Sequence, residues 1–201
     1  MELEGMFSSS KWSIIQLLAE QELSPLQISE ILNTSVANVS QQLRLLELLG
    51  IVSARKIPNR EKGKPRTLYA LSNDYVYVIS ALKNFAKKNL IKATPMHSAV
   101  ARILCIKDSQ LHYPLMKLFW MVEPQLANIQ AMFYDSNTST FHIIGSSLKL
   151  KLQNSYTFVY DGTKHTINVR LEPELRLERL KQGMYLVYDP KHMLKEEVVG
   201  E

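Results

Sequence analysis

The sequence predicts a protein that is mainly α with β (α+β), built in two parts. Apolar residues recur at helical spacing through the first fifty residues, and two short β-prone runs then flank a turn-rich basic segment. After residue 138 the helical patterns give way to strand patterns. With 201 residues, 46% of them hydrophobic, the chain has the length and composition of one or two globular domains.

The charge is positive and unevenly distributed. The net charge is +5; residues 1–92 hold 12 basic and 8 acidic residues, whereas residues 93–201 hold 12 and 11. This excess favours an anionic partner for the front half. One cysteine, Cys105, excludes an intrachain disulfide, and we expect it to be a buried, inert thiol. The chain shows neither a cationic start followed by an apolar run nor a membrane-spanning run, so we expect a cytoplasmic protein without a membrane partner.

Three helices are predicted at the start. Residues 8–20 place serine hydroxyls ahead of an amphipathic run. Ser24 is a natural N-cap for a second helix, with Pro25 at its first position, and this helix ends near Asn33. Ser35 is a natural N-cap for the third. Helix, short turn and helix form a helix-turn-helix, whose second helix enters the DNA major groove.

The third predicted helix, residues 35–49, has a polar front and an apolar rear. Asn38 and Gln41 carry amides that can donate to and accept from adenine, so we expect them to contact base edges. Ser40 and Arg44 are expected at phosphates. The residues expected to face DNA are Ser35, Ala37, Asn38, Ser40, Gln41 and Arg44. An ordinary amphipathic helix with a solvated polar face is the alternative.

A basic hairpin is predicted after Gly50 ends this helix. Residues 51–57 and 66–72 are β-prone, and the segment between them contains Pro, Asn and Gly. Six basic residues face one acid, Glu61; they are Arg55, Lys56, Arg60, Lys62, Lys64 and Arg66. Such a hairpin beside a recognition helix is the wing of a winged helix, which contacts phosphates or the minor groove. A merely solvated charged turn remains the alternative.

These pieces, in this order, resemble the ArsR-like winged helix-turn-helix transcription regulators of bacteria and archaea. The resemblance covers residues 8–92 and is carried by LQISEIL from Leu26, VSQQLRLL from Val39, LGIV from Leu49 and KPRTLYAL from Lys64. It implies that Ala37, Ser40, Gln41 and Arg44 face DNA and that the basic wing tip binds the backbone. Ser24 and Leu26 stand where metal-sensing members have a cysteine pair, so no metal or cofactor is expected.

A fourth helix is predicted over residues 73–90, ending the first domain at residue 92. Its apolar residues recur at i, i+3, i+4 and i+7 spacing, and three lysines are expected on a solvated face. Family members dimerise through a helix in this place, which implies a homodimer. The expected dimerisation residues are Tyr75, Val78, Ile79, Leu82, Phe85 and Leu90. Packing within one monomer is the alternative.

Residues 93–201 predict a helical segment followed by a small α+β domain. Residues 97–106, 111–122 and 123–135 have helical patterns; residues 138–145, 156–162, 164–171 and 183–189 have strand patterns; residues 173–183 suggest a short exposed helix. The density of apolar residues from 115 to 122 is compatible with a ligand pocket or with plain core. We expect this half to stabilise a dimer or to sense an effector, a small molecule of unknown identity.

The predicted function is therefore a homodimeric, sequence-specific, double-stranded-DNA-binding transcription regulator that is not an enzyme. One alternative is a winged-helix protein-interaction module. Another is a DNA-anchored enzyme with a degenerate nucleotidyltransferase-like domain, since Ile143-Ile-Gly-Ser-Ser faintly resembles the phosphate-holding start of those enzymes. Such enzymes need paired acids for metal, and Asp161 stands alone. For His142 and His165 the alternatives are a shared metal site and ordinary hydrogen-bonded histidines.

Overall fold

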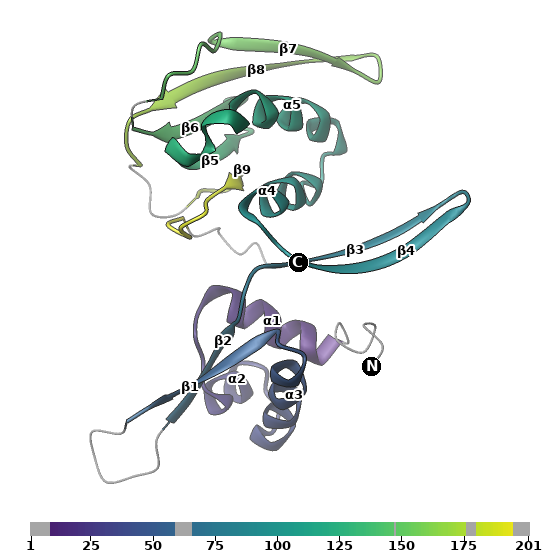
Figure 1. Ribbon diagram of the computed structural model, residues 1–201, viewed down its shortest axis with the longest axis vertical. Coiled ribbons are helices and arrows are strands. Elements are labelled where there is room, and N and C mark those ends of the chain that lie inside the picture. Colours follow the sequence, from purple (N-terminus) through teal and green to yellow (C-terminus); the bar gives the residue numbers. More distant parts are fainter. Residues whose placement is uncertain (1–8, 59–65, 147, 176–179, 195–201) are drawn as a thin grey trace. The chain divides into compact units, whose positions relative to one another are not determined.

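The computed structural model describes residues 9–58, 66–146, 148–175 and 180–194 (Figure 1). The chain divides into two compact units, Met1–Asp74 and Tyr75–Glu201. We expected the first domain to extend to residue 92; instead, residues 75–92 group with the second unit. The mixed helical and strand content, with an N-terminal helix-turn-helix and wing, confirms the predicted α+β class. Within the described residues no helix is both long and apolar enough to cross a membrane.

Unit 1 contains the three predicted helices and a two-stranded wing. They are α1 (Ser9–Glu20), α2 (Pro25–Ile31), α3 (Val36–Leu48), β1 (Val52–Ile57) and β2 (Arg66–Leu71). Ser24 caps α2 in a full capping box, in which the Ser24 hydroxyl accepts from the Gln27 backbone and the Gln27 side chain accepts from the Ser24 backbone. Pro25 occupies the first turn, as predicted.

Both ends of α3 are fixed by local residues. Ser35 Oγ accepts a hydrogen bond of 3.2 Å from the Asn38 backbone. At the other end Gly50 adopts φ +74°, and the Ile51 and Gly50 amides donate to Leu46 and Glu47 at 2.9 Å each. This is a Schellman motif, which places Ile51 against Leu46. Both side chains are buried.

The core of unit 1 lies behind α3 and anchors the wing. Val39, Leu43 and Leu46 on the rear of α3 are at most 1% exposed. The wing is antiparallel, with Val52 opposite Leu71 and Ile57 opposite Arg66. The foot of the wing forms an additional β-bridge with Leu23. The Leu23 backbone exchanges hydrogen bonds of 3.1 and 2.8 Å with that of Tyr69. The wing is therefore fixed to the α1–α2 connection.

Unit 2 begins with a second antiparallel hairpin, β3 (Tyr75–Leu82) and β4 (Phe85–Lys92), which pairs with no other strand of the described residues (Figure 1). The predicted helix over these residues is wrong. Alternating Tyr and Val favour a strand, and Asn84 at φ +64° closes a two-residue turn with Lys83. Apolar residues on both faces of a strand also satisfy helical spacing, so periodicity alone could not separate the two structures.

The remainder of unit 2 is a five-stranded sheet in the order β7-β8-β6-β5-β9. Its elements are α4 (Pro95–Leu104), α5 (His112–Val122), β5 (Ile129–Asp135), β6 (Thr140–Gly145), β7 (Ser155–Tyr160), β8 (Thr163–Glu172) and β9 (Met184–Tyr188), with short 3-10 turns at Ser109–Leu111 and Glu123–Asn128. Strands β6 and β8 are parallel, and the other neighbours are antiparallel. The predicted β7–β8 hairpin is confirmed, with Asp161 and Gly162 at positive φ.

Two apolar clusters sandwich this sheet. On one face, α4 and α5 contribute Ile103, Leu115 and Phe119 to a core shared with Phe141 and Ile143. On the other, Leu180 and Leu194 cover Ala131, Phe133, Ile144 and Leu186. The dense apolar run from 115 to 122 is therefore largely core, with Leu115, Leu118, Phe119 and Val122 buried.

Three expectations for unit 2 need correction. Residues 129–135 form the inner strand β5, between β6 and β9, and a strand buried on both faces shows an unbroken apolar run without a period. Cys105 is exposed, just after the end of α4. The helix expected over 173–183 lies partly outside the described residues, and residues 173–175 and 180–183 are not helical.

Candidate nucleic-acid interface

The front of α3, together with its N-cap Ser35, presents the six side chains of this segment that the sequence assigned to DNA. Ser35, Ala37, Asn38, Ser40, Gln41 and Arg44 are all exposed, whereas the rear of the helix is buried. The separation arises because successive helical residues are 100° apart, so positions 39, 43 and 46 face the core while 37, 40, 41 and 44 face outward. The polar front is thus held by a rigid apolar rear.

The two amides expected at base edges differ in their surroundings. Asn38 Nδ2 donates to Thr34 Oγ1 at 3.2 Å, and Asn38 Oδ1 accepts from Gln42 Nε2 at 3.4 Å. Gln41 has no side-chain hydrogen bond to any described residue. The Gln41 amide is therefore free to bond a base edge, while a base contact by Asn38 competes with bonds inside the unit.

Gln42 is a feature that sequence reasoning missed. It lines a pocket between α1 and α3 together with Ser13, Thr34 and Asn38. Its Oε1 is buried and has no hydrogen-bond partner among the described residues. The sequence Gln41-Gln42 does not by itself show that the two side chains differ. Helical geometry separates them by 100°, so Gln41 faces outward and Gln42 faces α1.

The described wing strands carry Arg55, Lys56 and Arg66, all exposed. Arg60, Lys62 and Lys64, which were also assigned to DNA, lie outside the described residues. Arg55 forms an ion pair with Glu22, with side-chain exposures of 63% and 44%. Lys56 and Arg66 are the described wing cations that have no acidic partner among the described residues.

The wing also carries Tyr69, on β2. Burial, together with the nearby negative charge of Glu47, raises the pKa of Tyr69.

The six residues predicted for dimerisation lie on the β3–β4 hairpin. Side chains alternate between the two faces along each strand, and residues opposite each other in the register share a face. Tyr75, Ile79 and Leu90 therefore lie on one face. Val78, Leu82 and Phe85 lie on the other. They do not form the single stripe expected on a helix. Ile79 and Leu82 are 63% and 68% exposed. A role for these residues in dimerisation stays a prediction.

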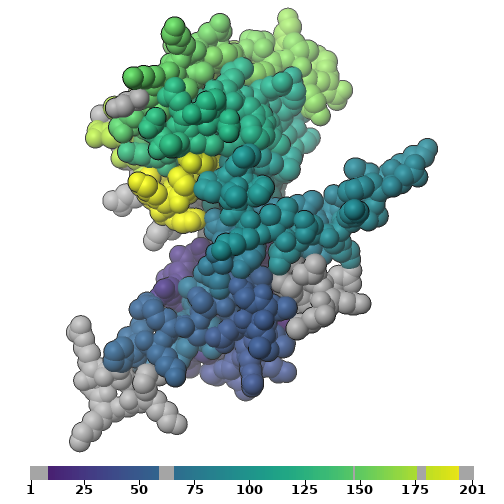
Figure 2. Space-filling model, viewed as in Figure 1, coloured from purple at the N-terminus to yellow at the C-terminus, as the bar shows by residue number. Residues whose placement is uncertain are grey.

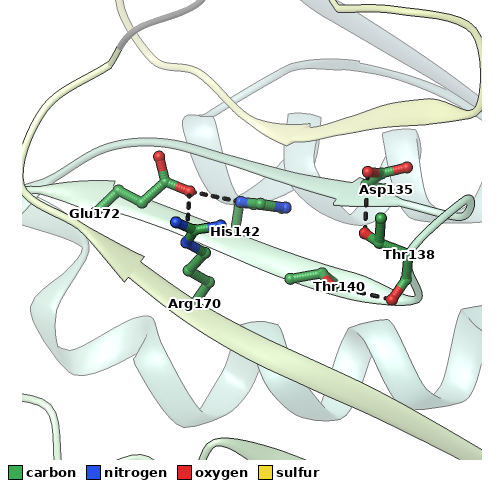
Figure 3. Close-up of polar contacts among 6 residues, drawn as sticks. All are labelled: Asp135, Thr138, Thr140, His142, Arg170 and Glu172. Carbon is green, nitrogen blue, oxygen red and sulfur yellow. Dashed lines mark hydrogen bonds and ion pairs between the residues drawn. The ribbon is translucent and has the colours of Figure 1, made fainter.

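A polar cluster of His142, Arg170 and Glu172 lies on the sheet of unit 2 (Figure 3). The Glu172 carboxylate on β8 lies 2.7 Å from His142 Nδ1 on β6 and 3.7 Å from Arg170 Nε. The His142 ring stacks on Phe133, with centroids 4.5 Å apart. His142 is therefore fixed by a carboxylate and an aromatic ring. Among the described residues, no group of three His, Cys, Asp or Glu side chains is arranged to hold a metal ion.

Gly145 has a packing role. A Cβ at this position would lie 2.3 Å from the Asn128 carbonyl oxygen, which only glycine avoids. This close approach coincides with the register shift between Ile129 and Ala131 on the neighbouring strand. Ser146 is exposed, and Ser147 lies outside the described residues. Close packing against Asn128 thus explains the glycine at position 145.

The turn between β5 and β6 is held by a buried acid. Asp135 is 7% exposed, and its carboxylate accepts from the Asn137 backbone at 2.9 Å and the Thr138 hydroxyl at 3.0 Å. The Thr140 hydroxyl donates to the Thr138 carbonyl at 3.1 Å (Figure 3). These bonds close the hairpin and satisfy the Asp135 carboxylate, which is therefore structural.

The comparison with known families agrees with this geometry. Residues 8–54 match the model of the family described as bacterial regulatory protein, arsR family. This segment spans α1, α2, α3 and the first residues of β1. No curated protein matches the chain. The N-terminal segment is therefore an arsR-family helix-turn-helix, a domain of DNA-binding transcription regulators.

Proposed function

We propose that this chain, whose N-terminal segment is an arsR-family helix-turn-helix, is a sequence-specific transcription regulator that binds DNA as a homodimer. The observation that carries the proposal is the front of α3, where Ala37, Ser40, Gln41 and Arg44 are exposed above a buried rear. Small side chains at the helix tip permit close approach to base pairs, and the Gln41 amide offers a donor and an acceptor.

The proposed DNA contacts are of two kinds, contacts to base edges and contacts to the phosphate backbone. Gln41 reads a base edge, and Asn38, fixed by Thr34 and Gln42, reads a second base or orients the tip. Ser35, Ser40 and Arg44 contact phosphates beside the groove. On the wing, Lys56 and Arg66 contact the backbone, and we assign the same role to Arg55 once it leaves Glu22, and to Arg60, Lys62 and Lys64.

A homodimer is proposed because one helix reads only a few base pairs, and two-fold symmetry presents a second helix to a second half-site. Unit 2 offers exposed apolar side chains for this contact on α5, where Trp120 and Met121 are 46% and 42% exposed. Light scattering of the purified chain at micromolar concentration should give twice the chain mass of 23.1 kDa.

The roles are tested by comparing Gln41→Ala with Lys56→Ala in fluorescence anisotropy titrations of specific and scrambled duplexes across a salt series. Gln41→Ala should reduce discrimination by about 1–3 kcal/mol and leave the salt slope unchanged. Lys56→Ala should weaken both duplexes alike and reduce the slope by about one unit. Equal loss of discrimination in both variants would contradict the assignment. Absence of binding by the parent protein at low salt would overturn the proposed function.

A further inference from the structure

The β3–β4 hairpin, residues 75–92, is called here the basic hairpin and carries a net charge of +4. Its sequence contains four lysines, Lys83, Lys87, Lys88 and Lys92, and no Asp or Glu. Residues 1–74 hold eight basic and eight acidic residues, so the net charge of unit 1 is zero. The basic hairpin is therefore a second segment of concentrated positive charge, in addition to residues 55–66 with their six basic residues and one acid.

The tip of the basic hairpin is apolar and exposed. Leu82 and Phe85 face each other across the Lys83-Asn84 turn and are 68% and 46% exposed. The Lys87 ammonium lies 5.7 Å from the centroid of the Phe85 ring, which brings a positive charge beside this pair. In Figure 2 the outer part of the hairpin projects away from the helices and the five-stranded sheet of unit 2.

The base of the hairpin differs from its tip. Val76, Tyr77, Leu90 and Ile91 are half-buried, and β3 contacts α4. An isolated two-stranded hairpin is marginally stable, so this base supplies support from unit 2. The cationic, apolar tip is the part left for a partner.

We propose that the basic hairpin is a second DNA-binding element, in which lysines contact phosphates and Leu82 and Phe85 wedge between base steps in the minor groove. The proposal rests on the proposed function, because it assigns a further contact to the same DNA. Cationic two-stranded elements enter DNA grooves, and apolar side chains inserted in the minor groove unstack base steps. A second copy of the hairpin fits poorly as the occupant, since two copies would bring eight lysines together without an acid.

The first test is site-specific photocrosslinking in the full chain to a labelled duplex at low salt. The photoreactive residue p-benzoylphenylalanine replaces Leu82, Gln41 or, as a control, Val159, which is 62% exposed on β7. We expect DNA adducts from positions 82 and 41 and none from 159. Adducts from 41 alone would overturn the hairpin proposal and leave the proposed function standing.

The other outcomes are equally decisive. Adducts from neither 41 nor 82 would overturn both proposals. A protein–protein adduct from position 82, in place of a DNA adduct, would make the basic hairpin a dimer contact and overturn its DNA role. Light scattering of each variant then shows whether the oligomeric state has changed.

A quantitative test separates phosphate binding from folding. Lys83→Ala/Lys87→Ala should reduce the salt slope of DNA binding by about 1.8, because each phosphate that a lysine neutralises adds about 0.9 to the slope. The matched control Lys149→Ala/Lys164→Ala removes two exposed lysines elsewhere in unit 2 and should leave the slope unchanged. Leu82→Ser/Phe85→Ser keeps the lysines, so it should keep the slope and abolish duplex bending measured by energy transfer between dye-labelled ends. An unchanged slope in the lysine variant would overturn the proposal.

Discussion

Two antiparallel hairpins, the wing and the basic hairpin, each form a separate two-stranded sheet, and they are held in different ways. The wing exchanges backbone hydrogen bonds with Leu23 at its base and buries Val52 in the core of unit 1. The basic hairpin pairs with no further strand in the part of the chain that the structure describes, and it leaves large apolar side chains exposed toward its tip. A hairpin fixed to a core can present charge without apolar surface, whereas apolar residues exposed on a free hairpin contribute little to folding and are available to a partner.

The largest expected effect separates apolar residues that stabilise the fold from those that do not. Leu43→Ala on the rear of α3 removes a fully buried side chain and should cost about 2–5 kcal/mol of the unfolding free energy of unit 1. Leu82→Ala, at 68% exposure, should change stability by less than about 0.5 kcal/mol. Each unit contains one tryptophan, Trp12 and Trp120, so urea unfolding in a Trp120→Phe background reports unit 1 alone. The Leu82 variant is read from Trp120 in a Trp12→Phe background.

A loss above about 2 kcal/mol in the Leu82→Ala variant would break this comparison. It would mean that the tip of the basic hairpin is buried within the chain or against a second copy. Repeating the unfolding at several protein concentrations distinguishes these two cases, because only association makes the transition depend on concentration.

The difference between the two hairpins also explains what the sequence could predict. Caps, turn residues and basic loops act locally, so Ser24, Ser35 and Gly50 allowed α2, α3 and the start of the wing to be predicted. The hairpin over 75–92 was taken for a helix because its strands are apolar on both faces, a pattern that satisfies either period. The choice between structures depends on tertiary contacts that a single sequence does not display.

The candidate site follows the same division. The outward residues of α3 were predicted because helical geometry fixes which side chains share a face. The ion pair of Arg55 with Glu22, 33 residues apart, and the bond between His142 and Glu172, 30 residues apart, were missed because each joins distant segments. Strand register, absent from the sequence, also divides the six expected dimerisation residues between two faces.

A smaller effect is expected when a glycine at positive φ is replaced by alanine, and the chain offers one such glycine for comparison in each unit. Gly50 and Gly162 have φ near +75°, and a Cβ at either position would meet no atom within 4 Å. Replacing either with alanine therefore adds backbone strain alone, about 1–2 kcal/mol. Gly50→Ala should lower the stability reported by Trp12, and Gly162→Ala that reported by Trp120. If Gly50→Ala lowers the stability reported by Trp120, or Gly162→Ala that reported by Trp12, the two units unfold together.

The N-cap of α3 should contribute about 1 kcal/mol, because the Ser35 hydroxyl satisfies the Asn38 backbone amide. Ser35→Ala removes this bond, while Ser35→Asn preserves a capping oxygen and should restore most of the loss. Urea unfolding followed at Trp12 measures both variants. Equal stability of the alanine and asparagine variants would mean that the cap does not determine where α3 begins.

The smallest expected effect concerns the ion pair between Glu22 and Arg55. Exposed pairs contribute between 0 and about 1 kcal/mol, so Glu22→Gln should barely change unfolding. It should nevertheless tighten DNA binding and steepen its salt dependence by up to about one unit, since Arg55 no longer has to leave an acid to reach a phosphate. The control Glu20→Gln removes a negative charge from the exposed end of α1. If both variants tighten binding alike, the effect is one of net charge, and Arg55 is a structural residue of the wing that does not contact DNA.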